Sequence, residues 1–123
     1  MLLTRLLGIR GESLAARHLR KAGLRIVARN FRCPAGEIDL IAADRETIIF
    51  VEVKTRRSDR AAAPEESIGP MKRRRMERAA HWWLARRGYP AAAYRFDAIS
   101  IVEPPGEAPR IRHIVEAFRP RRG

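Results

Sequence analysis

The sequence predicts a mixed α/β domain in which a central sheet is flanked by helices. Residues from Thr47 to Val53 are apolar on both alternating faces except at Glu52, which is typical of a central strand rather than a half-exposed edge. Two longer segments, 4–21 and 68–87, carry apolar residues at helical spacing before and after this strand. At 123 residues, the chain is large enough for a single core.

The order of the predicted elements follows from their start and stop signals. The first helix is expected from about Thr4 to Lys21, where Gly23 ends it. The second helix has Pro70 in its first turn and Gly88 at its end. Its predicted buried stripe consists of Met76, Ala79, Ala80, Trp83 and Leu84. Five strands are predicted, over residues 24–31, 37–43, 47–55, 94–102 and 110–118.

No internal repeat or Ser/Gly linker divides the chain. We therefore expect one domain over residues 1–118 and a disordered basic tail over residues 119–123. Residues 56–66 directly follow the central strand and are predicted to form a mobile loop of the length that is often functional.

A hairpin between the second and third strands would bring acidic residues together. If the turn is residues 44–47, Ala43 lies opposite Ile48, and continuing this register places Asp39 opposite Glu52. A shift of one residue would turn one member of each pair to the other face of the sheet, so the prediction depends on the register.

The same register places Glu37 opposite Lys54. The carboxylates of Asp39 and Glu52 and the ammonium of Lys54 would then converge on one spot. Asp39 and Glu52 would supply the hard oxygen ligands that Mg²⁺ or Mn²⁺ prefers. Such an ion lowers the pKa of a bound water and offsets charge on a leaving oxygen, and Lys54 could orient that water. The alternative is a buried ion-pair cluster without chemistry.

Glu12 lies near the middle of the apolar side predicted for the first helix, which holds Gly8, Ile9, Ala15, Ala16, Leu19 and Ala22. Its neighbours one turn away, Gly8 and Ala16, are small and would let the helix approach the sheet and deliver Glu12 to the Asp39 and Glu52 site. The alternative is a glutamate at the helix edge whose carboxylate reaches solvent.

These residues resemble two groups of proteins. Asp39 followed thirteen positions later by Glu52-Val53-Lys54 is similar to the D…ExK core of the PD-(D/E)xK nuclease superfamily, with a spacing like that of archaeal Holliday-junction resolvases. Ile38 stands where the superfamily pattern has proline. Five motifs, in order, resemble the small and largely uncharacterised bacterial YraN-like family: Gly11-Glu12 with Ala15-Ala16, Arg29-Asn30-Phe31-Arg32, Gly36-Glu37-Ile38-Asp39-Leu40-Ile41, Phe50-Val51-Glu52-Val53-Lys54-Thr55-Arg56 and Arg95-Phe96-Asp97.

The resemblance implies a restriction-endonuclease-like mixed sheet flanked by helices, with a metal-dependent phosphodiesterase site. It implies that Asp39, Glu52 and Lys54 are catalytic and that Glu12 is an outer ligand of the metal or its water, with Mg²⁺ or Mn²⁺ as cofactor. Asp97 receives no role beyond the resemblance, and the histidines show no metal-ligand spacing.

The formal net charge of +12 predicts a partner that is nucleic acid or another anionic surface. A proteome rich in arginine would explain why arginine replaces lysine, but not the excess of basic over acidic residues. Only Lys21, Lys54 and Lys72 are lysines, which makes Lys54 and Lys72 candidates for positions that need an ammonium.

Basic residues at the start of the second helix oppose its dipole, a cost that an arriving phosphate would offset. Lys72 falls on the sheet side of this helix and is therefore aimed at the active site. The residues expected to contact backbone phosphates are Arg56, Arg57, Arg73, Arg74, Arg75 and Arg78. The alternative is a solvated basic face. Trp83 is predicted to be core, whereas Trp82 on the flank should pack rather than stack on a base.

Cys33 is the only cysteine, which excludes an intramolecular disulfide. Without a signal peptide of proper length or an apolar stretch able to span a membrane, a cytoplasmic location and no membrane partner are expected.

The leading functional hypothesis is a DNA endonuclease or resolvase acting on branched or single-stranded structures, with DNA favoured over RNA. If junctions are the substrate, a homodimer is expected, because two strands must be cut. The alternatives are a non-catalytic basic nucleic-acid-binding module with a vestigial nuclease site, and an interaction protein on an RNA-rich assembly.

Overall fold

The computed structural model describes residues 2–57, 68–88 and 93–120, with only the backbone for residues 2–7. The elements, in chain order, are α1 (Leu2–Lys21), β1 (Arg25–Cys33), β2 (Gly36–Ala43), β3 (Thr47–Arg56), α2 (Pro70–Arg87), β4 (Ala93–Val102) and β5 (Arg110–Phe118). All predicted elements are found, with small shifts at their ends. Most of the loop predicted over 56–66 and the end of the predicted tail lie outside the described residues.

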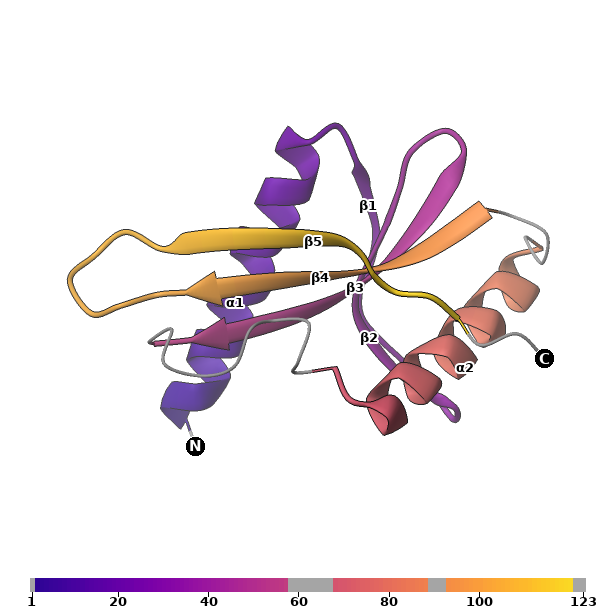
Figure 1. Ribbon diagram of the computed structural model, residues 1–123, viewed down its shortest axis with the longest axis horizontal. Coiled ribbons are helices and arrows are strands. Elements are labelled where there is room, and N and C mark those ends of the chain that lie inside the picture. Colours follow the sequence, from indigo (N-terminus) through magenta and orange to yellow (C-terminus); the bar gives the residue numbers. More distant parts are fainter. Residues whose placement is uncertain (1, 58–67, 89–92, 121–123) are drawn as a thin grey trace.

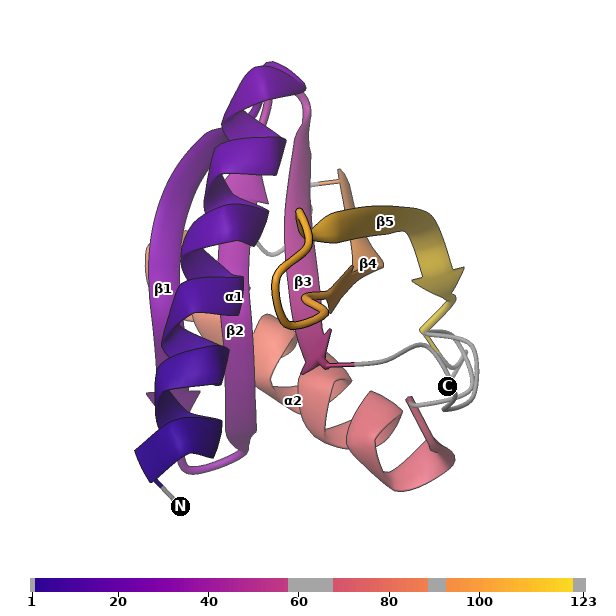
Figure 2. The ribbon, with the colours of Figure 1, turned by 90° about the vertical axis from the view of Figure 1, so that its left-hand side faces the viewer.

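The five strands form one mixed sheet in the order β1-β2-β3-β4-β5 (Figure 1). β3 pairs in parallel with β4, and the other neighbours are antiparallel. The prediction that β3 is a central strand is confirmed, since it has neighbours on both sides. α1 lies against one face of the sheet and α2 against the other (Figure 2).

Each helix covers its own core cluster. Beneath α2, the Trp83 ring meets Phe50 edge-on at 5.9 Å between centroids, and the predicted buried stripe of α2 is confirmed in full. The α1 residues that pack in the other cluster include Ala15, Ala16 and Leu19, which are completely buried. Because both faces of the central strands are covered, their near-continuous apolar sequences are explained.

Details of the helix predictions need correction. α2 begins at Pro70 rather than at residue 68, because Gly69 has an extended backbone (φ −72°, ψ 170°) and precedes the first turn. Gly88 ends α2 in the left-handed conformation (φ 78°), as predicted. Ile9 on α1 is 54% exposed, and Ala22, one residue beyond the end of α1, is also exposed, so neither belongs to the buried face.

The close approach of α1 to the sheet occurs at Gly11, not at Gly8. A Cβ atom at Gly11 would lie 2.0 Å from the Oγ1 atom of Thr55, whereas one at Gly8 would meet nothing within 4 Å. Gly11 therefore sets the distance between α1 and β3, and it does so directly beside Glu12.

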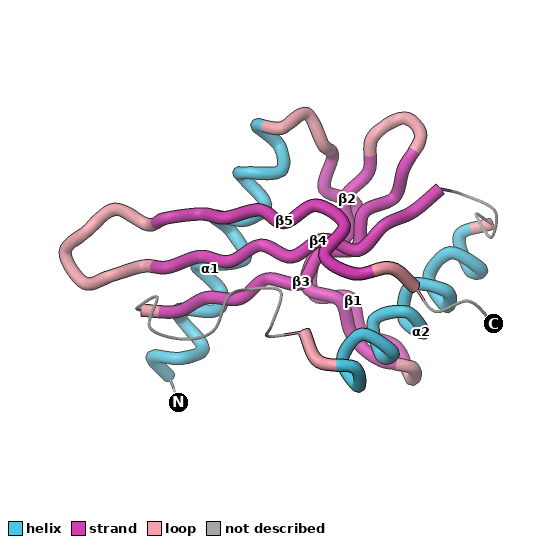
Figure 3. The backbone as a smooth tube through the Cα atoms, in the orientation of Figure 1, coloured by secondary structure: helices cyan, strands magenta, loops and turns pink. Residues whose placement is uncertain are grey.

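The strands β2 and β3 form a fork. Their ladder runs from Ala43↔Ile48, the predicted register, to Leu40↔Val51 and stops there. Beyond that point β2 remains paired with β1 as far as Cys33↔Gly36, and β3 remains paired with β4 as far as Arg56↔Val102. The β1–β2 hairpin consequently diverges toward α2 while β3, β4 and β5 continue in the other direction (Figure 3).

Two features account for the fork. One oxygen of the Asp39 carboxylate accepts the backbone N–H of Val53 at 2.8 Å, so a side chain replaces the next ladder bond. Asn30 on β1 lies between the paired positions Arg29 and Phe31 and has a positive φ of 48°, an uncommon conformation that bends a strand. Beyond the Leu40↔Val51 pair, the fork therefore separates the β1–β2 hairpin from β3, β4 and β5.

Candidate active site

Two carboxyl groups meet at the opening of the fork. Glu52 is only 5% exposed and lies on β3, one residue beyond the last position paired with β2. Asp39 is half-buried on β2, and its carboxyl group is within hydrogen-bonding reach of Glu52. Burial, followed by the negative charge of Asp39, raises the pKa of Glu52 to about 7. A proton on Glu52 or a cation beside the two carboxyl groups is therefore favoured.

Lys72 reaches this pair from α2. Its Nζ atom lies 2.5 Å from Oε1 of Glu52. Although burial alone would lower it, the pKa of Lys72 is raised by the hydrogen bond to Glu52 and by the charges of Glu52 and Asp39. The predicted direction of Lys72, toward the sheet and the acidic residues, is thus the one observed.

The position of α2 depends on Gly36. A Cβ atom on Gly36 would lie 2.8 Å from the carbonyl oxygen of Arg75, so the start of β2 and the first turns of α2 are in near-backbone contact. The same contact that seats α2 on the hairpin also brings Lys72 within reach of Glu52.

Glu12 approaches from α1. Burial and the charge of Asp39 raise the pKa of Glu12, whereas Arg29, Arg32 and a hydrogen bond with Asn30 lower it. Its Oε1 atom is buried and has no hydrogen-bond partner among the described residues. Asn30 was not singled out from the sequence, although its positive φ and its bond to Glu12 make it part of the site.

Lys54 and Glu37 do not pair as predicted. The extended register would place them opposite each other, but the β2–β3 ladder has ended before either residue. Glu37 is exposed and lies 3.5 Å from Arg32, while Lys54 is half-buried beside Ser100 of β4 in the register. No ion pair of Lys54 is seen within residues 2–57, 68–88 and 93–120. By strand alternation, Lys54 faces the same side as Glu52.

The arginines predicted to contact phosphate have different environments. Arg73 donates a hydrogen bond to the carbonyl of Ile68 at 2.8 Å and lies 5.4 Å from the centre of the Phe118 ring, so it helps to hold α2 in place. Arg56 ends β3, where its carbonyl accepts the backbone N–H of Glu103. The remaining members of the predicted set are exposed: Arg57, Arg74, Arg75 and Arg78.

The tryptophans behave as predicted, since Trp83 is core and Trp82 packs beside Phe31 with the guanidinium of Arg86 3.9 Å from its ring centre.

Asp97 belongs to a separate polar cluster on β4 and β5. It is fully buried, and its carboxylate meets Nε2 of His113 at 2.8 Å, Nε of Arg95 at 3.0 Å and the backbone N–H of Glu116 at 2.9 Å. Despite burial, these hydrogen bonds hold the pKa of Asp97 below its ordinary value. Glu116 has a positive φ of 54° within the irregular part of the β4–β5 ladder. Asp97 therefore secures a bulge in β5, a role that the sequence did not indicate.

The donor set fits a divalent cation that is partly ligated by water or substrate. In the described part of the chain, no group of three or more His, Cys, Asp or Glu side chains is arranged to hold a metal ion. However, Asp39 and Glu52 form a carboxyl pair whose mutual repulsion a cation would relieve, and the unpartnered oxygen of Glu12 is an acceptor without a donor. Mg²⁺ is commonly bound through one or two carboxylates, with waters and phosphate completing its shell.

A five-stranded mixed sheet with one helix on each face, and acidic residues at a fork between central strands, defines an α/β protein of the restriction-endonuclease-like type. The chain belongs to the uncharacterised protein family UPF0102, whose profile matches residues 11–101.

Relatives of similar length support this assignment. The chain is 46% identical over 114 residues to a UPF0102 protein of Geobacter sulfurreducens, covering 93% of this chain and 89% of that protein. It is 50% identical over 112 residues to a UPF0102 protein of Nocardia farcinica, covering 91% and 88%. No helix in the described ranges combines the length and apolar character needed to cross a bilayer.

Proposed function

We propose that this protein is a metal-dependent endonuclease that hydrolyses phosphodiester bonds in DNA with branched or single-stranded structure. The observation that carries the proposal is the meeting of the Asp39 and Glu52 carboxyl groups in the fork, with Lys72 beside them and Glu12 arriving from the opposite helix. Stability alone does not require such a cluster, because buried charges are costly and need a compensating reason. The net charge of +12 supports a polyanionic substrate.

Asp39 and Glu52 would hold Mg²⁺ or Mn²⁺. Asp39 uses one oxygen to accept the Val53 N–H, which orients the carboxylate and leaves its other oxygen available. Glu12 would accept a hydrogen bond from a water in the outer shell through its unpartnered Oε1 atom. When bound, the ion would supply a water of lowered pKa and offset charge on the phosphate.

The two lysines have different proposed roles. Lys54, which lies on the same face of β3 as Glu52, would orient the attacking water or neutralise charge on the non-bridging oxygens of the phosphate. Lys72, whose side chain is 43% exposed, can reach both Glu52 and solvent and would contact the incoming phosphate. Hydrolysis would join the oxygen of the attacking water to phosphorus and break the bond between phosphorus and the leaving oxygen. The attacking water would lose one proton to solvent, and the leaving oxygen would gain one from solvent. A cytoplasmic location would give access to DNA.

Two observations favour a non-catalytic module with a vestigial site. Lys72 forms an ion pair with Glu52, and no group of three or more His, Cys, Asp or Glu side chains among the described residues is arranged to hold a metal ion. This alternative predicts nucleic-acid binding that is indifferent to Mg²⁺ and Mn²⁺.

Cleavage of labelled linear, single-stranded, flap and four-way-junction DNA with Mg²⁺ and with Mn²⁺ tests the proposal. Lys54→Ala should abolish cleavage and leave DNA affinity nearly unchanged. Neutralising the exposed Arg74 should instead lower the salt dependence of duplex binding by about 0.9 log unit per lost contact. Absence of cleavage of all four substrates, together with absence of metal binding, would favour the non-catalytic module.

Light scattering with and without a four-way junction tests the proposed homodimer. A junction offers two equivalent strands, so a resolvase with one site per chain needs a two-fold pair. A strict monomer that cuts one strand would make the protein a flap or single-strand nuclease.

A further inference from the structure

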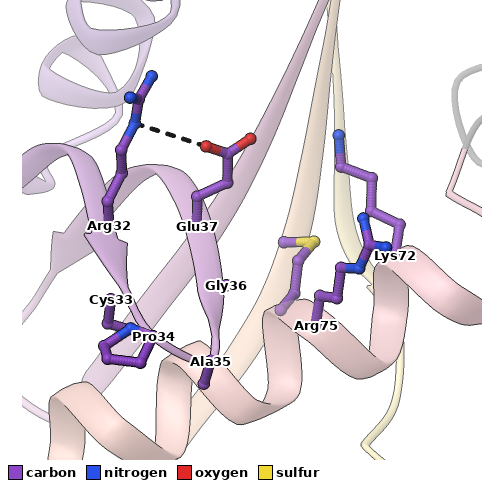
Figure 4. A pocket seen from close by; sticks show the side chains of 9 residues that line it. Arg32, Cys33, Pro34, Ala35, Gly36, Glu37, Lys72 and Arg75 are labelled. Carbon is purple, nitrogen blue, oxygen red and sulfur yellow. Dashed lines mark ion pairs between the residues drawn. The ribbon is translucent and has the colours of Figure 1, made fainter.

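We propose that the groove between the β1–β2 turn and α2 binds one strand of single-stranded nucleic acid and leads it to the carboxyl pair. The groove has a volume of about 440 Å³, and its walls include Arg32 and Glu37 from the hairpin and Lys72 and Arg75 from α2 (Figure 4). This inference deepens the proposed endonuclease function and rests on it for the fate of the bound strand, but the binding itself can be tested separately.

The charge of the groove suits a phosphate backbone. Cations come from both walls, and Glu37, the acidic residue among those lining it, is paired with Arg32 at 3.5 Å. Arg75 is exposed, and its contact with Met71 sulfur at 3.6 Å is not an ion pair. No acidic partner of Arg75 is found in the part of the chain that the structure describes. Its guanidinium can therefore meet a phosphate without breaking an existing ion pair.

Lys72 connects the groove to the proposed active site. Lys72 lines the groove, and its Nζ atom contacts Glu52 in the fork. In Figure 4 the Lys72 side chain extends from α2 along the diverging strands, with the Arg75 head group beside it. A nucleic-acid strand lying in the groove would thus have one phosphate at Arg75 and the next phosphate at Lys72 and the carboxyl pair.

The size of the groove selects a single strand. A volume of about 440 Å³ lies in the range of pockets that hold one small molecule, roughly 300–1,000 Å³. It accommodates a nucleotide or two but not a duplex, whose major groove alone is about 12 Å wide. A Cβ atom on Gly36 would lie 2.8 Å from the carbonyl oxygen of Arg75, and both residues line the groove, so its two walls lie close together there.

Fluorescence anisotropy of a labelled oligothymidylate in EDTA tests this binding without catalysis. Arg75→Gln should weaken binding at least tenfold and lower the salt slope by about 0.7 log unit, the value for one phosphate contact on a single strand. Arg17→Gln is the control, because Arg17 is an exposed arginine on α1 that does not line the groove and is not among the residues expected to contact phosphate. It should change the affinity less than twofold.

A substitution that should tighten binding distinguishes the loss of a phosphate contact from damage to the fold. Glu37→Gln deletes the negative charge of the groove and should tighten binding severalfold, whereas Glu46→Gln, an exposed acid in the β2–β3 turn, should not. Equal effects of Arg17→Gln and Arg75→Gln would overturn the inference, as would equal competition by duplex and single-stranded DNA. If the groove variants behave as expected but no substrate is cut, the inferred binding of a single strand is supported and the proposed endonuclease function is refuted.

Discussion

Replacing Glu52 with glutamine should stabilise the fold at alkaline pH, even though it removes a proposed metal ligand. Glu52 has a pKa of about 7 against an ordinary value of 4.5, because burial and Asp39 together outweigh the attraction of Lys72. A raised carboxyl pKa means that the native state binds the proton more tightly than the unfolded state. The associated stability is complete below about pH 4.5 and is lost as the pH rises through 7.

The magnitude follows from the same shift. At about 1.4 kcal/mol per unit, ionised Glu52 lowers the free energy of unfolding by at most about 3 kcal/mol at pH 8 and by less than about 1 kcal/mol at pH 5. Glutamine keeps the shape of the side chain and removes the charge. Relative to wild type, Glu52→Gln should therefore gain about 2 kcal/mol between pH 5 and pH 8.

Urea denaturation in metal-free buffer at both pH values measures this gain. Glu46→Gln, which neutralises an exposed carboxylate, should stay within about 0.5 kcal/mol of wild type at either pH. A Glu52→Gln protein that is destabilised equally at pH 5 and pH 8 would show that folding does not raise the pKa of Glu52, and it would refute the prediction.

Three further predictions concern close contacts and the buried acid of β4. Gly11→Ala should lower the free energy of unfolding by about 1–3 kcal/mol, since its Cβ would press on Thr55, whereas Gly8→Ala should be neutral or stabilising; thermal melts of the pair decide this. Gly36→Ala should cost a similar amount and reduce oligothymidylate affinity, and unchanged binding would disprove its role in seating α2. Asp97→Asn should cost about 3–5 kcal/mol at pH 7 by urea denaturation. Because the pKa of Asp97 is depressed, this difference should shrink as the pH falls below 3.8.

The fold followed from the sequence because its signals are local. The apolar run of β3, the turn before Thr47 and the glycine that ends α2 each identify an element without reference to the rest of the chain. The register at Ala43 and Ile48 was also predictable, because Asp44 accepts hydrogen bonds from the backbone of Glu46 and Thr47 and closes the turn.

The fork was not predictable in this way. Extending the register assumed that backbone pairing continues past Leu40, whereas the Asp39 carboxylate takes the Val53 N–H instead. The replacement of a backbone partner by the Asp39 carboxylate depends on the bend at Asn30, which is a three-dimensional feature. The contacts of Gly11 and Gly36 are equally non-local, since each depends on an element that comes much later in the chain.

The pairing of β3 with β4 has a consequence for the protein during its synthesis. Glu12, Asp39 and Glu52 are all made before β4, the strand that covers the second edge of β3 from Thr47↔Ala93 to Arg56↔Val102. Until β4 emerges, β3 is an unpaired apolar edge, and the acidic residues lack the sheet that fixes their positions. We expect chains that end before β4 to have no organised acidic cluster, so that any activity of the site would appear only once translation has nearly finished.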